Sequence, residues 1–181
     1  KTIGLGLMYG MGIAKLAASL DISQNNAKAL KKKYNDNVHF LNNIIVRATR
    51  YTEQNGYINT LLGRKCRFDL WENKDFHDKR MMSHENAKKT WAWNEMKRAG
   101  TYRALNRLIQ GSAADQTKKA MVDLWKKLGM VPMIQIHDEL NVSIANETQV
   151  TEIKEIMESA VELHVPVKCE AKLGINWGEI K

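Results

Sequence analysis

The stretch MIQIHDELNVSI, residues 133 to 144, constrains the fold more than any other part of the sequence. Two apolar runs meet there over His137, Asp138 and Glu139, a pattern that predicts two strands joined by a tight turn. Adjacent carboxylates at such a turn repel each other unless water or a cation relieves them. Because Mg²⁺ binds through one or two carboxylates plus substrate phosphates, these residues alone fit a metal site and a solvated turn equally well.

Helical spacing dominates the rest of the chain. It predicts a long helix or a helix pair from Ser23 to Gly56, a second long helix from about residue 101 or 102 to 128, and an amphipathic helix between 147 and 164. GYINTLLGRKCRF predicts a hairpin near 57–68, and residues 71–100 are interpreted as a loop followed by a short helix from about Ser83. VKCEAKL, residues 167–173, alternates like a half-buried final strand. Together these elements predict an α+β fold with an antiparallel sheet.

Composition favours a polyanionic partner. The 181 residues carry 28 Lys and Arg against 20 Asp and Glu, a formal charge of +8, which suits nucleic acid better than a membrane. On composition alone, a basic surface that serves only solubility fits equally well. Two distant cysteines make neither a disulfide framework nor a zinc motif, and no stretch predicts a membrane span or a signal peptide. We therefore expect a cytosolic protein. Because the chain starts with Lys1, not Met, we also expect a piece of a longer or processed polypeptide.

Two further groups of residues are candidates for binding. Lys1, Leu5 and Tyr9 fall on one face of a helix, where a cation, an apolar surface and a ring can bind a nucleotide or simply pack. Asn106 and Gln110 are also four residues apart, between arginines, and amides at that spacing can contact the minor-groove acceptors that every base pair presents. The small residues of GSAA after them would let this helix lie close to a strand.

Taken together, and in this order, these motifs resemble the C-terminal half of a family A DNA polymerase, the bacterial polymerase I type found also in many phages. KTIGLGLMYG is similar to the end of the family's nucleotide-binding fingers motif, GYINTLLGRKCRF to its GY-x-x-T-L-x-G-R-R hairpin, RALNRLIQGSAAD to its N-x-x-x-QG-[ST]-AAD segment, and QIHDEL to its motif C. The resemblance implies an incomplete right-hand fold. Residues 1–100 would be a fingers-like helical region and residues 101–181 a palm-like region of helix, HDE hairpin, helix and final strand.

The resemblance also implies roles for individual residues. Two Mg²⁺ ions would activate the primer 3′-hydroxyl and hold the dNTP, with Asp138 as a metal-binding carboxylate and Glu139 as its neighbour. Lys1 would contact the triphosphate, and Leu5 and Tyr9 the nucleotide and the templating base. The remaining roles concern primer-template DNA. His137 would contact the primer terminus, Asn106 and Gln110 would contact the minor groove, and Arg64 and Arg67 would contact the phosphate backbone.

Three departures qualify this picture. Leu5 stands where the family has Phe or Tyr, so we expect altered sugar selectivity or speed. The segment from 71 to 100, with three tryptophans, is longer than its bacterial counterpart. The family's motif A aspartate has no equivalent here, so we expect the chain alone to be inactive and to need an upstream segment that carries it. A non-catalytic DNA-binding module and another metal-dependent enzyme such as a nuclease are the competing hypotheses.

Overall fold

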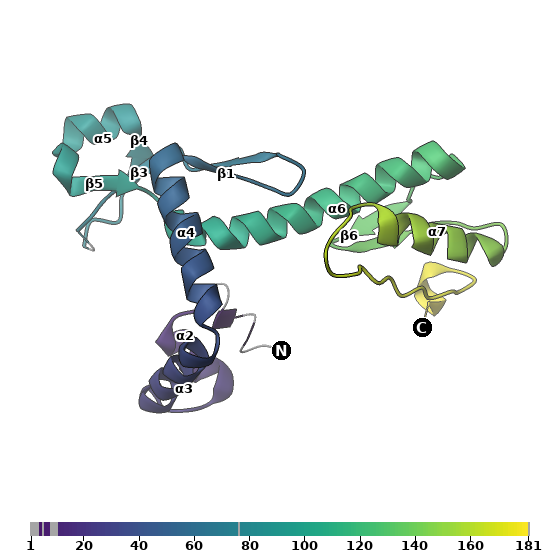
Figure 1. Ribbon diagram of the computed structural model, residues 1–181, viewed down its shortest axis with the longest axis horizontal. Coiled ribbons are helices and arrows are strands. Elements are labelled where there is room, and N and C mark those ends of the chain that lie inside the picture. The colour runs from purple at the N-terminus through teal and green to yellow at the C-terminus, as the bar shows by residue number, and fades with distance from the viewer. Residues whose placement is uncertain (1–3, 5, 8–10, 76, 181) are drawn as a thin grey trace. The chain divides into compact units, whose positions relative to one another are not determined.

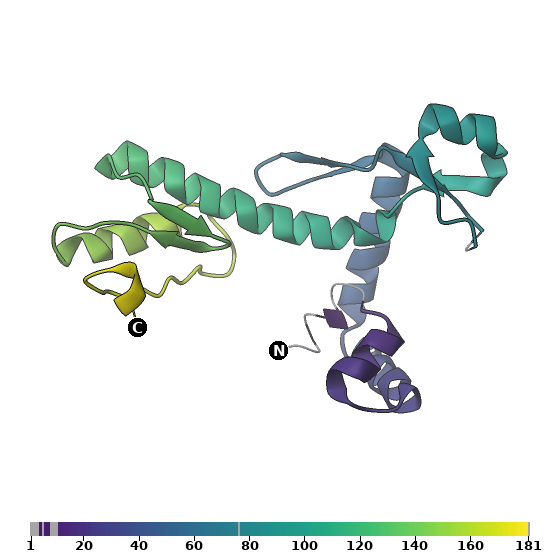
Figure 2. The same ribbon diagram turned by 180° about the vertical axis from the view of Figure 1, so that it is seen from behind.

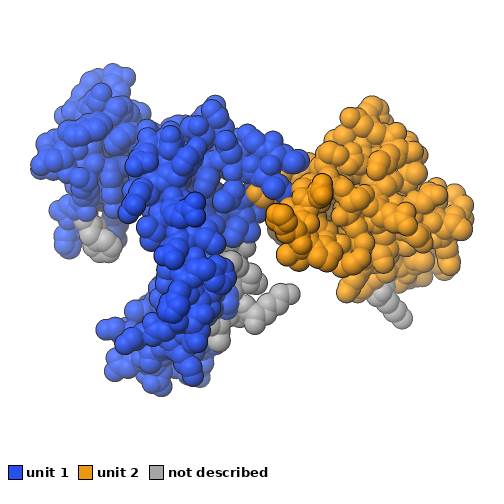
Figure 3. Space-filling model, in the orientation of Figure 1, with its two compact units in different colours: residues 1–111 blue, residues 112–181 orange. Residues whose placement is uncertain are grey.

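The computed structural model describes residues 4, 6, 7, 11–75 and 77–180. The chain divides into two compact units, residues 1–111 and 112–181 (Figure 3). The division falls inside a long helix, later than the expected boundary between residues 100 and 101. The first turns of that helix belong to unit 1 because they bury Ala104 and Leu105 in its core.

Unit 1 contains three consecutive helices, α2 (Ile13–Leu20), α3 (Gln24–Asn37) and α4 (His39–Asn55). The Ser23 hydroxyl accepts a hydrogen bond from the Asn26 N–H at 3.2 Å, so Ser23 is the N-cap of α3 as predicted. Gly56, at φ 78°, ends α4 in the left-handed conformation that glycine adopts without strain. Val38 separates α3 from α4, which decides between the two alternatives in favour of a helix pair.

A hairpin follows, as the sequence predicts. Strands β1 (Tyr57–Asn59) and β2 (Lys65–Arg67) pair antiparallel, with Tyr57 opposite Arg67 and Asn59 opposite Lys65. Gly63, at φ 83°, lies in the loop. The hairpin is anchored in the main core of unit 1, which also contains residues of α4 and of the long helix. The buried members of that core are Leu41, Ala48, Ile58, Phe68, Ala104 and Leu105.

Residues 70–98 form a small sheet that the sequence analysis did not predict. Strands β3 (Leu70–Asn73), β4 (Met81–Ser83) and β5 (Met96–Arg98) pair antiparallel in the order β4-β3-β5. The short helix α5 (His84–Thr90) begins after Ser83, as expected, and closes a small core with the sheet (Figures 1 and 2). Thus the segment interpreted as a loop followed by a short helix is a small folded unit, here called the β3–β5 insertion because it lies in the chain between the β1–β2 hairpin and the long helix.

The predicted second long helix is present as α6 (Ala104–Leu128), preceded by a 3₁₀ turn over Thr101–Arg103. Gly129, at φ 64°, follows it in the left-handed conformation, and its N–H bonds the Trp125 carbonyl at 2.9 Å. Although α6 has 25 residues, neither it nor any other helix among the described residues is long and apolar enough to cross a membrane.

Unit 2 packs the last part of α6 against a hairpin and a helix. Strands β6 (Ile134–Ile136) and β7 (Glu139–Asn141) pair antiparallel, and α7 (Thr148–Ser159) follows. Leu124 of α6 is fully buried against Ile153 and Ile156 of α7. Partly buried side chains from β7 and the loop after it complete this core. They are Leu140, Val142 and Ile144.

The prediction of a final strand over residues 167–173 is wrong, because this segment pairs with no strand among the described residues. Its backbone bonds a side chain instead: the Cys169 N–H donates to the Glu158 carboxylate at 2.9 Å, and Lys168 Nζ donates to the same group at 3.1 Å. These contacts, the backbone N–H first, hold the pKa of Glu158 below its usual range. Burial, with the Glu158 charge, raises the pKa of the Cys169 thiol.

Candidate active site and nucleic-acid interface

The HDE sequence forms the turn of the β6–β7 hairpin. Ile136 pairs with Glu139, which leaves His137 and Asp138 as a two-residue turn. His137 has a φ of 53°, in the left-handed region, at a cost on the order of 1–2 kcal/mol for a side chain with a Cβ. Gln135 Nε2 donates to the His137 carbonyl at 3.1 Å and so supports the turn. A strained histidine where glycine would fit freely marks this turn as a candidate functional site.

The strand register puts Glu139 on the open face of the hairpin. Directly paired residues share a face, so Glu139 lies with Ile136 and Ile134, whereas Leu140 points to the core. Both isoleucines are 39% exposed, and the three polar residues of the turn are exposed as well. Two carboxylates therefore stand in solvent beside apolar surface, accessible to a ligand.

The carboxylates of this turn fit a hard divalent cation whose other ligands come from a bound substrate. Asp138 and Glu139 offer carboxylate oxygens from adjacent positions, one in the turn and one at the start of β7. Within the described ranges, no group of three or more His, Cys, Asp or Glu side chains is arranged to hold a metal ion. Mg²⁺ is typically held by one or two carboxylates plus phosphate oxygens, so the pair fits Mg²⁺ but not a closed, all-protein metal site.

Asn106 and Gln110 lie one turn apart near the start of α6, as the sequence predicts. Gln110 is exposed. Asn106 is half-buried, and its inaccessible Oδ1 has no hydrogen-bond partner among the described residues. A buried acceptor without a partner destabilises the fold by about 1–3 kcal/mol. A polar group of this kind in a native structure therefore points to a role other than stability. Arg107, one residue after Asn106, places its guanidinium 5.4 Å from the centre of the Phe68 ring.

The β1–β2 hairpin brings basic residues to the same part of unit 1. Arg64 Nη2 donates to the Gly111 carbonyl at 3.0 Å, so this side chain is held against α6. Lys65 Nζ lies 4.4 Å from the centre of the Tyr57 ring, and Arg67 is exposed at the end of β2. The close approach expected at GSAA occurs at Gly111, which faces the hairpin. The structure thus brings Arg64 to the helix that carries Asn106 and Gln110.

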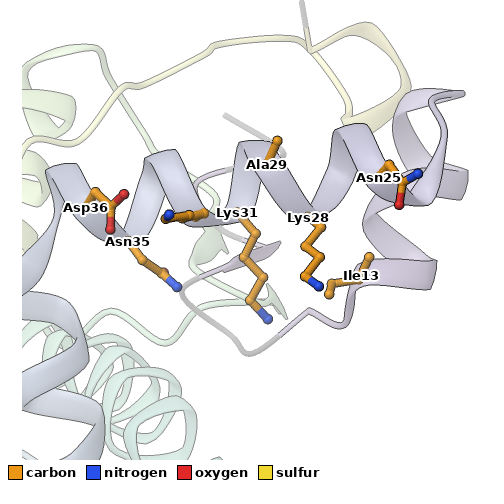
Figure 4. Close-up of a pocket in the computed structure, with 8 residues that line it drawn as sticks. Ile13, Asn25, Lys28, Ala29, Lys31, Asn35 and Asp36 are labelled. Atoms are coloured by element: carbon orange, nitrogen blue, oxygen red, sulfur yellow. The ribbon is translucent and has the colours of Figure 1, made fainter.

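Lys1, Leu5 and Tyr9 lie outside the described residues. Among the described residues, a hollow of about 560 Å³ lies along α3, and Lys28 and Lys31 are two of the side chains that line it (Figure 4). Lys31 Nζ donates to the Met11 carbonyl at 3.2 Å, and Lys28 and Lys32 also line the hollow. Spacing of three and four residues could have indicated a shared basic surface.

The β3–β5 insertion carries an aromatic cluster that sequence reasoning missed. The Trp71 and His84 rings stack with centroids 4.5 Å apart, and Trp93 lies 5.9 Å from Trp71 and 6.1 Å from His84. On Trp71, the Arg98 guanidinium lies 4.9 Å from the ring centre. A single sequence could not have shown that residues from β3, from α5 and from the turn before β5 form one cluster.

A charged pair closes the loop between β3 and β4. Asp78 accepts two hydrogen bonds from the Arg80 guanidinium, at 2.9 and 2.7 Å, and one from Trp91 Nε1 at 3.0 Å. The Arg80 contact above all holds the pKa of Asp78 well below its usual range, and Asp78 in turn raises the pKa of Arg80. The loop is therefore fixed to the tryptophan in the core of the insertion.

Comparison with known families decides what kind of chain this is. The model of DNA polymerase family A matches residues 1–179. The chain belongs to DNA polymerase family A. The part of this family A chain with the HDE turn and the Asn106–Gln110 helix is therefore homologous to polymerase sequence, and the resemblance inferred from four motifs is confirmed.

Bacterial and phage polymerases are among the relatives of the family A chain. A DNA-directed DNA polymerase of Pseudomonas phage M6 is 30% identical over 98% of this chain and 28% of its own length. DNA polymerase I of Borreliella burgdorferi is 31% identical over 99% of this chain and 19% of its own length. A solved structure, the POL domain of Pol1 from M. smegmatis in complex with DNA primer-template and dNTP, is 27% identical with a TM-score of 0.68, covering 92% of this chain and 28% of that one. The family A chain thus spans less than a third of the length of each of these relatives.

Proposed function

We propose that this chain is part of a template-directed DNA polymerase that adds dNTPs to a primer 3′-hydroxyl. The observation that carries the proposal is the exposed Asp138–Glu139 pair at a strained two-residue turn, in a chain of family A. Duplex binding alone would need neither the strain nor two adjacent exposed carboxylates. Bacterial and phage polymerases are among the relatives, which supports our proposal that this activity takes place in the cytoplasm of a bacterial or phage-infected cell.

In this proposal Asp138 binds Mg²⁺ and Glu139 tunes the site from the neighbouring position. When bound, two such ions lower the pKa of the attacking hydroxyl and stabilise charge on the transferred and leaving phosphates. The chain itself provides a pre-formed turn, because the β6–β7 pairing fixes both carboxylates next to each other before any ligand arrives. His137 contacts the primer terminus from the first position of the same turn.

The proposed DNA contacts come from unit 1. Asn106 and Gln110 donate to minor-groove acceptors, which are alike in all base pairs, so they hold the duplex without selecting its sequence. Arg64 and Arg67 contact the phosphate backbone, which positions the duplex and makes its affinity depend on salt. The Arg64 hydrogen bond to Gly111 holds that guanidinium beside the amides.

For the nucleotide, the proposal assigns Lys1 to the triphosphate and Leu5 and Tyr9 to the base and sugar. These roles are supported by the match of the family model from residue 1 onward. A cation at the triphosphate favours the transition state, where negative charge accumulates on the phosphates. Because leucine cannot stack as an aromatic ring does, we expect weaker discrimination at the sugar 3′ position.

We further propose that a complete catalytic site needs a carboxylate from a polypeptide beyond these 181 residues. Among the described residues, no third His, Cys, Asp or Glu side chain completes a metal-binding cluster with Asp138 and Glu139. Two adjacent carboxylates can bind one ion with substrate, but they cannot bridge two ions productively. The chain alone is therefore expected to be inactive.

The test is reconstitution. The purified chain, alone and mixed with an upstream polypeptide that carries an aspartate in a D-Y/F-S-x-x-E context, is incubated with primer-template, dNTPs and Mg²⁺, and primer extension is followed. We expect extension only in the mixture, lost with Asp138→Ala and kept with Glu152→Ala, an exposed carboxylate on α7. Extension that survives Asp138→Ala would exclude the metal-site assignment. Robust extension by the chain alone would refute the need for the second polypeptide.

A further inference from the structure

We propose that the β3–β5 insertion binds single-stranded DNA by stacking a base on Trp93. This inference rests on the proposed function, which supplies a template strand. Trp93 is 68% exposed. This exposure is unusual because tryptophan has a large apolar side chain that is stabilised by burial against a partner. Its ring is held at the edge of an existing aromatic cluster, so a base would extend that cluster outward.

The backbone under Trp93 is fixed. Trp93 starts a short 3₁₀ turn, Trp93–Glu95, in which Glu95 Oε2 accepts the Ala92 N–H at 3.1 Å. Lys74, at the end of β3, joins this turn to the sheet: its N–H bonds the Glu95 carbonyl at 2.7 Å and its Nζ bonds the Asn94 carbonyl at 2.6 Å. A ring that is already positioned loses little conformational freedom on binding, which favours its use as a stacking surface.

The cluster behind Trp93 supports its ring. Trp71 contacts Trp93 on one side and is covered by His84 and Arg98. Arg98 is itself fixed, since its Nε donates to the Glu53 carbonyl and its Nη1 to the Phe68 carbonyl, both at 3.2 Å. Through Arg98, the stack is thereby joined to α4 and to Phe68, which directly follows the β1–β2 hairpin.

Charge decides the class of partner. Residues 70–100 carry seven Lys and Arg against five Asp and Glu, and the exposed Lys74 binds the residue directly after Trp93. Single-strand binding sites combine such cations, for phosphates, with aromatic rings, for bases. A protein partner would need a broader apolar patch. The other large exposed apolar side chains described in the insertion, Leu70 and Met81, lie on the sheet face opposite to Trp71.

The test measures binding of a fluorescein-labelled strand of about 20 thymidines to the full chain by anisotropy at low salt. Stacking contributes about 1–3 kcal/mol per base, so Trp93→Ala should weaken binding about tenfold. Trp93→Phe, which keeps a ring, should restore most of the affinity. Trp177→Ala removes a comparably exposed tryptophan, 59% exposed, from unit 2 and should leave the affinity unchanged. Thermal unfolding checks that every variant is folded.

A blunt DNA duplex separates this inference from the proposed function. The duplex should bind equally to wild type and Trp93→Ala, because the amides and arginines of α6 and the hairpin are intact. Equal single-strand affinity in wild type and Trp93→Ala would overturn the inference and point to a protein partner for this surface. Loss of single-strand and duplex binding together would also overturn it. A wild-type chain that binds no duplex would count against the proposed polymerase function instead.

Discussion

Gly111 of α6 and Thr60 of the β1–β2 hairpin are in such close contact that a Cβ built on Gly111 would lie 2.6 Å from Thr60 Cγ2. The Arg64 side chain from the same hairpin bonds the Gly111 carbonyl. Close packing against Thr60 and a hydrogen bond from the charged Arg64 side chain therefore both hold the hairpin at Gly111, the residue after Gln110. The hairpin cannot shift without moving away from the amides proposed to hold DNA.

Replacing Gly111 by alanine should destabilise unit 1 by about 1–3 kcal/mol, because the added methyl group has no room next to a β-branched side chain. Urea unfolding measures the change. Primer-template affinity should fall as well, since Arg64 moves with the hairpin. Gly12→Ala is the control: Gly12 has a φ of −72°, and no atom of the described residues lies within 4 Å of an added Cβ. Equal stability of the two variants would contradict the close contact.

Asn106→Leu should separate stability from DNA binding. The substitution removes a buried oxygen that has no hydrogen-bond partner, so the free energy of unfolding should stay constant or rise. Affinity for primer-template should fall about tenfold, by the same factor for duplexes of different sequence, because the contact is made to acceptors common to all base pairs. A variant with lower stability and unchanged DNA affinity would show that Asn106 is a structural residue.

Asp138 and Glu139 should differ in the reconstituted polymerase. Asp138→Asn should lower the rate of dNTP incorporation by about a thousandfold, the scale expected when a metal-binding carboxylate is lost. Glu139→Gln should cost far less, because Glu139 tunes the site and is not the principal ligand. Single-turnover incorporation at several Mg²⁺ concentrations measures both. Equal losses would show that both carboxylates bind metal.

Asp78→Asn should destabilise the insertion in a pH-dependent way. The folded pKa of Asp78 lies below its unfolded value of about 4, so the ionised carboxylate stabilises the fold above that pH. This stabilisation is lost as the pH falls below about 4 and Asp78 takes up a proton. The difference in urea midpoint between wild type and Asp78→Asn should therefore be largest near pH 7 and shrink in acid. Asp69→Asn, at an exposed position, is the control for the substitution itself.

Much of the fold could be predicted because its signals are local. Ser23, Gly56 and Gly129 mark helix ends by capping chemistry, and the structure has the helix boundaries there. The β6–β7 turn was readable because apolar runs flank three polar residues. The roles of Asp138 and Glu139 stay predictions, since no ligand contact is part of the described structure.

The predictions that failed concern strand pairing, because a single sequence does not show which strands lie side by side. Strands β3, β4 and β5 are three or four residues long in a polar segment, too short for alternation to appear. Residues 167–173 do alternate, but alternation predicts which side chains share a face and not whether a neighbouring strand is available. Glu158 takes the Cys169 N–H that a strand partner would have used.

The open face and edges of the β6–β7 hairpin affect how this chain can be handled. Two strands of three residues each, with Ile134 and Ile136 exposed, are hydrogen-bonded only to each other among the described residues. Such edges and apolar faces readily accept a strand from another molecule, so concentrated solutions of the chain should self-associate. Co-expression with a polypeptide that covers this surface should therefore raise the yield of monodisperse protein, even where catalysis is not assayed.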